Sequence, residues 1–188
     1  LIWLTVFYRQ DRLDPEPKSF VFKTLILGAL VQKALYAPVI SVVMPEAQAG
    51  PNASDYILSV VLVALIQESM KLLSVRYSIY VSKEFDEKID GIIYGSALGL
   101  GFAAMTNLDM IIRNGGSVLT AISSIVVIES LAHASFTGLS CYFLGQDKFG
   151  KFNMFRLPGA VVLATALNAL SRILIDDLVR DGFRMNYM

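Results

Sequence analysis

The sequence predicts an all-α integral membrane protein, a bundle of about six transmembrane helices whose first helix is truncated. Hydrophobic residues make up 55% of the 188 residues, charged residues only 17%, and the mean hydropathy is +0.57. A soluble domain carries more charge, so we expect the apolar side chains to face lipid. The apolar runs lack the alternating pattern of outer-membrane strands, and backbone groups in lipid must be hydrogen-bonded within the protein, which favours helices.

Residues 1–8 are apolar but too few to cross a bilayer, which takes about 20 helical residues. We interpret them as the tail of a truncated span. Five later stretches are long enough to cross, and turn-forming or charged residues bound each of them: residues 20–44, 56–80, 92–112, 118–144 and 157–179. We expect residues 1–188 to form a single transmembrane domain.

Lysine and arginine in short loops predict the orientation of the bundle, because they are retained on the cytoplasmic side. Basic residues gather in loops around residues 9–19, 81–91 and 145–156, whereas residues 45–55 contain none and the turn at 114–116 has only Arg113 beside it. This alternation places the three basic loops in the cytoplasm. Two basic residues on the predicted outer side are exceptions to this rule, Arg180 and Arg184.

A row of small residues marks the span at 92–112. Gly91, Gly95, Gly99 and Ala103 follow one another at intervals of one helical turn. Such a row lets a neighbouring helix approach closely. It also places Asn107, the next residue of the row, deep in the bundle.

Polar side chains within the predicted spans are candidate functional residues, because they are costly in lipid and face the interior or a wet cavity. Glu68 and Lys71 are three residues apart, so they share a helix face and can pair. A single intramembrane histidine such as His133 has a structural alternative, a hydrogen bond to a neighbouring helix. The whole set is Gln67, Glu68, Lys71, Thr106, Asn107, Glu129, His133, Asn168 and Arg172.

Several classes of site are disfavoured by what the spans lack. Glu68, Glu129 and His133 are too few for a convincing metal site, so we expect no metal and no other cofactor. The sequence lacks the glycine-flanked elbow serine that would suggest a Ser-His-Asp triad. It also lacks the paired broken helices that would suggest a transporter. Cys141 is expected to be a buried thiol. Sixteen basic and 16 acidic residues give a net charge of +0, which leaves no basic surface for nucleic acid.

Two strings and a series of motifs resemble the PrsW family of intramembrane proteases, which is related to the CAAX-protease and bacteriocin-processing group. The strings are FYRQDR at 7–12, followed by PEPK at 15–18, and FDEKIDGIIYG at 85–95. The resemblance covers essentially the whole chain. It implies a bacterial inner membrane, a lipid bilayer environment, and a membrane protein as partner or substrate.

The catalytic motifs of the family are only partly present. Its two adjacent glutamates and following lysine correspond to Gln67, Glu68 and Lys71, so the first glutamate is an amide here. Its phenylalanine followed by glutamate and asparagine corresponds to a stretch ending in Thr106 and Asn107, so a hydroxyl replaces the carboxylate.

The two remaining motifs differ in how well they are kept. The histidine that leads into a Phe-Thr-Gly run is intact at His133. The last motif, a histidine with an asparagine four residues later, corresponds to Ala164 and Asn168, so its histidine is missing. These departures fit natural divergence better than engineered inactivation.

The resemblance implies that a first-motif glutamate and the second-motif side chain activate water, while the last motif stabilises the oxyanion. Substitution at Gln67, Thr106 and Ala164 then favours a catalytically impaired pseudoprotease that serves as a binding partner or complex subunit, since general base catalysis is worth about 10²- to 10⁴-fold. The alternative is an active glutamate-dependent endopeptidase with Glu68 as base. In that case His133, Asn107 and Asn168 would orient water or substrate.

Overall fold

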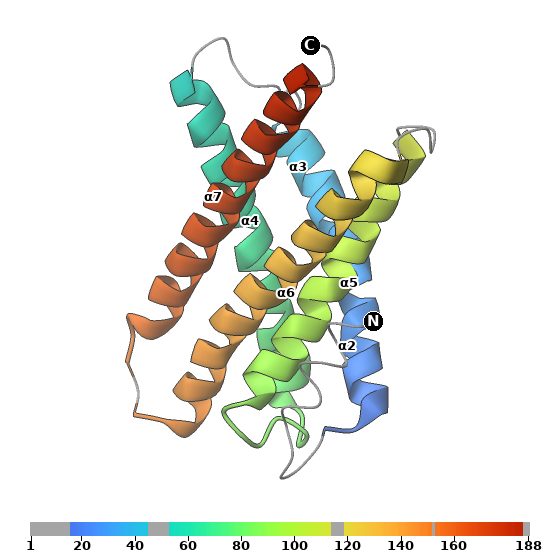
Figure 1. Ribbon diagram of the computed structural model, residues 1–188. Helices are drawn as coiled ribbons and strands as arrows, with labels where there is room; N and C mark the ends of the chain where they lie inside the picture. Colours follow the sequence, from blue (N-terminus) through green and yellow to red (C-terminus); the bar gives the residue numbers. More distant parts are fainter. Residues whose placement is uncertain (1–15, 45–52, 114–118, 152, 186–188) are drawn as a thin grey trace.

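The computed structural model describes residues 16–44, 53–113, 119–151 and 153–185, and the regular structure of this part of the chain is entirely helical (Figure 1). The predicted all-α class is therefore confirmed. The elements in order are α2 (Lys18–Leu30), the π-helical segment η1 (Val31–Tyr36), α3 (Ala37–Val43), α4 (Ala53–Tyr77), the 3-10 turn η2 (Ile79–Val81), α5 (Asp90–Arg113), α6 (Leu119–Phe149) and α7 (Arg156–Met185).

Five segments of the described chain are long and apolar enough to cross a membrane, and each overlaps one predicted span. They are Lys18–Val43, Ser54–Val81, Asp90–Arg113, Ile125–Phe149 and Arg156–Asp177. The first of them is a single span assembled from α2, η1 and α3. The predicted truncated span at residues 1–8 lies outside the described residues.

Successive spans run in opposite directions, so the bundle has two ends (Figure 1). The Lys148 end contains the starts of α2, α5 and α7 and the ends of α4 and α6. There the ammonium of Lys148 donates hydrogen bonds of 2.7 and 2.6 Å to the carbonyl oxygens of Tyr80 and Phe85. The Arg172 end contains the end of α3, the start of α4 and the part of α7 around Arg172.

The central helix is α5, which packs closely against α6. A Cβ atom added at Gly91 or Gly95 would collide with Cys141 of α6, and one at Gly99 would collide with the carbonyl of His133. The predicted row of small residues is thus confirmed as a helix contact. Cys141 is fully buried, as expected.

The first span widens into a π-helix between α2 and α3. Pro38 follows the π-helical segment, and because proline has no backbone N–H it cannot continue the α-helical hydrogen bonding of the preceding turn. The widened turn directs Gln32 into the bundle, where only 5% of its surface is exposed. It also brings Tyr36 over α5, with its ring 5.4 Å from that of Phe102.

Candidate functional site

A buried ion pair lies at the middle of the bundle. Nζ of Lys71 donates a hydrogen bond of 2.6 Å to Oε1 of Glu68, and both side chains have no exposed surface. The same ammonium lies 3.1 Å from Nδ1 of His133 on α6. Because a protonated lysine can only donate, Nδ1 accepts and the imidazole proton sits on Nε2. The pairing that the spacing of Glu68 and Lys71 predicts is confirmed.

A third helix, α7, completes the arrangement through Asn168. Its Nδ2 donates to Oε1 of Glu68 at 2.6 Å and to Oε1 of Gln67 at 3.2 Å. The second carboxylate oxygen of Glu68, Oε2, is buried and has no hydrogen-bond partner in the described structure. We call the group Gln67, Glu68, Lys71, His133 and Asn168 the polar centre. Its five residues come from α4, α6 and α7, and Oε2 is its one open carboxylate acceptor.

Aromatic rings form one wall of the polar centre. The ring centroid of Phe102 lies 5.3 Å from Nζ of Lys71 and 5.5 Å from the ring of His133. Tyr36 packs on the same phenylalanine, and its side chain also approaches Gln67. No sequence motif singles out Tyr36, because a tyrosine near the end of a span is an ordinary interfacial residue.

Two predicted site residues form their hydrogen bonds away from the polar centre in the described structure. Asn107 is buried, as the small-residue row predicts, but its Nδ2 donates to Oγ of Ser130 at 3.1 Å. The hydroxyl of Thr106 donates to the backbone carbonyl of Phe102 in its own helix at 3.1 Å. Both side chains therefore serve contacts on or beside α5.

Ala164 lies on α7 one turn before Asn168 and is fully buried. Residues four apart lie on one helix face, so position 164 faces the same interior as the polar centre. A methyl group here offers neither a proton nor an acceptor.

The donor set of the polar centre does not fit a metal ion. A divalent cation takes three or four ligands such as carboxylates, imidazoles or thiolates. Here only Glu68 and His133 are of that type, and the ammonium of Lys71 lies between them.

A second cluster of charged groups lies at the Lys148 end. Carboxylate oxygens of Glu16, Asp86 and Asp90 all lie within 4.8 Å of one another, the one group of three potential metal ligands in the described part of the chain. Tyr94 donates a short hydrogen bond to Glu16. Burial is the main cause that raises the pKa of Glu16 to about 8, and the charges of both aspartates add to it. Glu16 is far from Asp86 and Asp90 in the sequence, so no local pattern predicted that it meets them.

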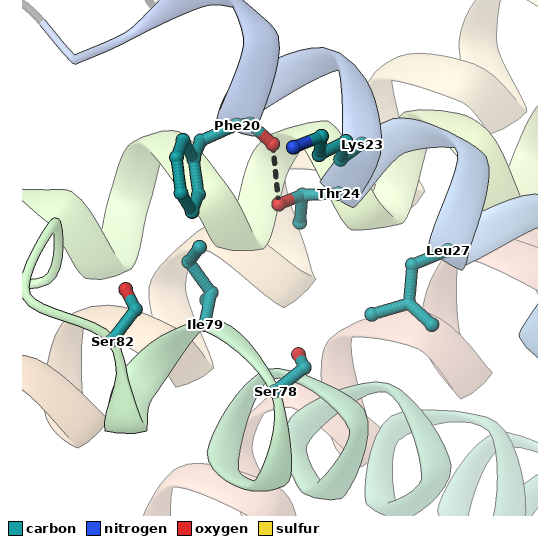
Figure 2. Close-up of a pocket in the computed structure, with 7 residues that line it drawn as sticks. All are labelled: Phe20, Lys23, Thr24, Leu27, Ser78, Ile79 and Ser82. Atoms are coloured by element: carbon teal, nitrogen blue, oxygen red, sulfur yellow. Dashed lines mark hydrogen bonds between the residues drawn. The ribbon is translucent and has the colours of Figure 1, made fainter.

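A pocket of about 250 Å³ lies at the same end, between α2 and the end of α4 (Figure 2). The hydroxyl of Thr24 donates to the carbonyl of Phe20, and that of Ser78 donates to the carbonyl of Ser74. Two of the pocket's hydroxyls thus donate to backbone carbonyls four residues earlier in the chain. The lining residues are Phe20, Lys23, Thr24, Leu27, Ser78, Ile79 and Ser82, and the polar centre contributes none of them.

Known bacterial proteins that are similar to this chain carry the name Protease PrsW. That of Geobacillus kaustophilus is 34% identical over 146 residues, which is 78% of this chain and 62% of the relative. That of Bacillus subtilis is 30% identical over 112 residues, with coverages of 60% and 50%. That of Oceanobacillus iheyensis is 31% identical over 148 residues, with coverages of 79% and 65%. The chain therefore aligns with less than two thirds of the length of each of these relatives.

No solved structure matches the chain. A family model described as PrsW family intramembrane metalloprotease matches residues 16–179. This match spans most of the chain, including all five membrane-spanning segments and the complete polar centre. The protein is an integral membrane protein and belongs to the PrsW family.

Proposed function

We propose that this chain is a catalytically impaired member of its family, a pseudoprotease that acts as a binding partner or subunit of a membrane complex. The observation that carries the proposal is the condition of Glu68. Its carboxylate is fully buried, and one of its oxygens already accepts hydrogen bonds from both Lys71 and Asn168. We treat residues 1–188 as one functional domain.

The chemistry of proteolysis explains why this arrangement favours inactivity. A general base must accept a proton from water, and Oε1 of Glu68 already accepts hydrogen bonds of 2.6 Å from both Lys71 and Asn168. The residues at positions 67, 106 and 164, an amide, a hydroxyl and a methyl group, supply no second base. The metal that the family description implies would require ligands that the polar centre does not offer.

The alternative, an active glutamate-dependent endopeptidase, has one observation in its favour. Oε2 of Glu68 is open. Asn168 donates a hydrogen bond to the carboxylate of Glu68, and His133 lies beside the ammonium that pairs with this carboxylate. A water molecule at Oε2 could be activated there without a metal. In this alternative Asn107 would need to move, because it bonds to Ser130.

A reconstituted cleavage assay distinguishes the two. The protein, its Glu68→Gln variant and a Gln67→Glu/Thr106→Glu/Ala164→His variant are placed in liposomes with a panel of single-span membrane proteins. We expect no cleavage by the first two and measurable cleavage by the third, which restores the family motifs. Cleavage by the unaltered protein that Glu68→Gln abolishes would overturn the pseudoprotease proposal.

The partner is sought separately, by purification from the native membrane in mild detergent and mass spectrometry of the intact assembly. A complex subunit predicts a membrane protein bound at fixed stoichiometry. A preparation that contains this chain alone, with trapped peptide fragments that disappear in the Glu68→Gln variant, would instead support the protease.

A further inference from the structure

Arg172 is a charged residue of the last span that the polar centre does not use. It lies about 8 Å along the helix from the end of that span at Asp177. The ion pairs formed between described residues are Lys33 with Asp109 and Glu68 with Lys71, so Arg172 takes part in neither. A guanidinium inside a span needs a partner or a wet cavity.

The cavity is present. A pocket of about 230 Å³ lies at the Arg172 end, where η1, α3, α4 and α7 meet, and Arg172 lines it together with Asp176, Tyr36 and Tyr56. Asp176 follows Arg172 by one helical turn on the same face, yet the two form no ion pair in the described structure. Instead the carboxylate accepts a hydrogen bond of 2.5 Å from the hydroxyl of Tyr56. The pocket thus presents one positive and one negative group side by side.

We propose that this pocket binds the headgroup of a phospholipid that carries a phosphate and a primary ammonium, phosphatidylethanolamine, with the phosphate on Arg172 and the ammonium on Asp176. A guanidinium binds phosphate oxygens with paired, charge-assisted hydrogen bonds. A carboxylate held by a tyrosine hydroxyl still has acceptor capacity for an ammonium.

The position of the pocket agrees with a lipid headgroup. It lies where three spans approach their ends, and tyrosines such as Tyr36 and Tyr56 are the residues that proteins place at headgroup level. The charge pattern selects among headgroups. A purely anionic headgroup or a peptide carboxylate would meet the negative charge of Asp176, and a choline has no N–H to donate.

Lipid retention by the purified protein tests this proposal without any cleavage, so it stands or falls independently of the proposed function. Native mass spectrometry is used to follow titration with phosphatidylethanolamine, phosphatidylcholine and phosphatidylglycerol of identical acyl chains. We expect the first to bind about tenfold more tightly than the others, the effect of one charge-assisted contact. Arg172→Ala should weaken the binding of all three lipids, because each of them carries the phosphate that Arg172 contacts. Lys23→Ala, which changes an exposed cation at the opposite end, should leave their binding unchanged.

Asp176→Asn provides a readout that misfolding cannot imitate. Asparagine can still accept from Tyr56, but it has no negative charge to hold an ammonium or repel an anion. We expect this variant to bind phosphatidylglycerol more tightly than the unaltered protein does and to lose its discrimination against phosphatidylcholine. Equal binding of the three lipids by the unaltered protein, unchanged affinity in Arg172→Ala, or unchanged preference in Asp176→Asn would overturn the proposal. Displacement by an equal concentration of soluble O-phosphoethanolamine would assign the pocket to a free metabolite instead.

Discussion

At the scale of single residues, Lys71 determines the chemistry of the polar centre, because one ammonium contacts both a carboxylate and an imidazole. The sequence predicted its pairing with Glu68, since both residues lie on one helix and spacing alone fixes their face. The contacts of His133 and Asn168 cross between helices. They depend on how the helices pack, so the sequence identified these residues but not their partners.

Replacing Lys71 with methionine should destabilise the protein by about 3–5 kcal/mol, because Glu68 would remain as a buried carboxylate without its cation. The free energy of unfolding is measured by SDS titration in mixed micelles, with helix content as the signal. The double variant Lys71→Met/Glu68→Gln should lose less stability than Lys71→Met alone. An equal loss in the two variants would mean that packing, not charge, explains the effect.

Glu16 makes stability depend on pH at the Lys148 end. Its pKa in the folded protein is about 8, against an ordinary value of 4.5, so folding favours the protonated carboxyl. The resulting stability is complete below pH 4.5 and is lost as the pH rises through 8. We therefore expect Tm to fall between about pH 5 and pH 9 when thermal unfolding is followed in detergent.

Glu16→Gln is the matched control for this pH dependence. Glutamine can still accept the hydrogen bond of Tyr94 and has the shape of the protonated carboxyl, but it does not ionise near the aspartates. The variant should lose the part of the decline in Tm that ionisation of Glu16 causes in the unaltered protein. If the two melting profiles change with pH in parallel, another group is responsible.

At the scale of elements, the contact between α5 and α6 positions His133. The small-residue row predicted this kind of contact from sequence, because glycines at one-turn intervals leave a smooth helix face. The π-helical segment before Pro38 was not predicted, since hydropathy measures the length of a span and is insensitive to one widened turn. Its consequence, Tyr36 at the edge of the polar centre, was missed for the same reason.

Gly99→Val tests whether α6 depends on this close approach. The added side chain would meet the backbone at His133, so we expect a loss of about 1–3 kcal/mol in the free energy of unfolding. Gly159→Ala on α7 is the control, because an added Cβ there meets no atom within 4 Å. It should stabilise by about 0.5–1 kcal/mol through helix propensity. Equal effects of the two substitutions would contradict a special role for the α5 contact.

At the scale of the whole molecule, hydropathy predicted the five described spans, because apolar runs of about 20 residues are rare in soluble helices and match the thickness of a bilayer. It did not predict where the helices end. Helix α6 continues to Phe149 and α7 to Met185, beyond their apolar runs, since polar residues with good helix propensity extend a helix outside lipid. No local sequence pattern predicted that the segments of the Lys148 end meet, because Lys148 contacts carbonyl groups that are 68 and 63 residues away in the chain.

The positive-inside pattern makes a last prediction, that the Lys148 end faces the cytoplasm. Single cysteines at Lys83, for the Lys148 end, and at Arg113, for the opposite end, are introduced in a Cys141→Ala background, both positions being exposed. A membrane-impermeant maleimide should label Arg113→Cys in intact cells and Lys83→Cys only in inverted vesicles. The reverse pattern would invert the bundle and place Glu16 and its neighbours outside. Their pH response would then sense the external medium, whereas the predicted orientation exposes it to the buffered cytoplasm.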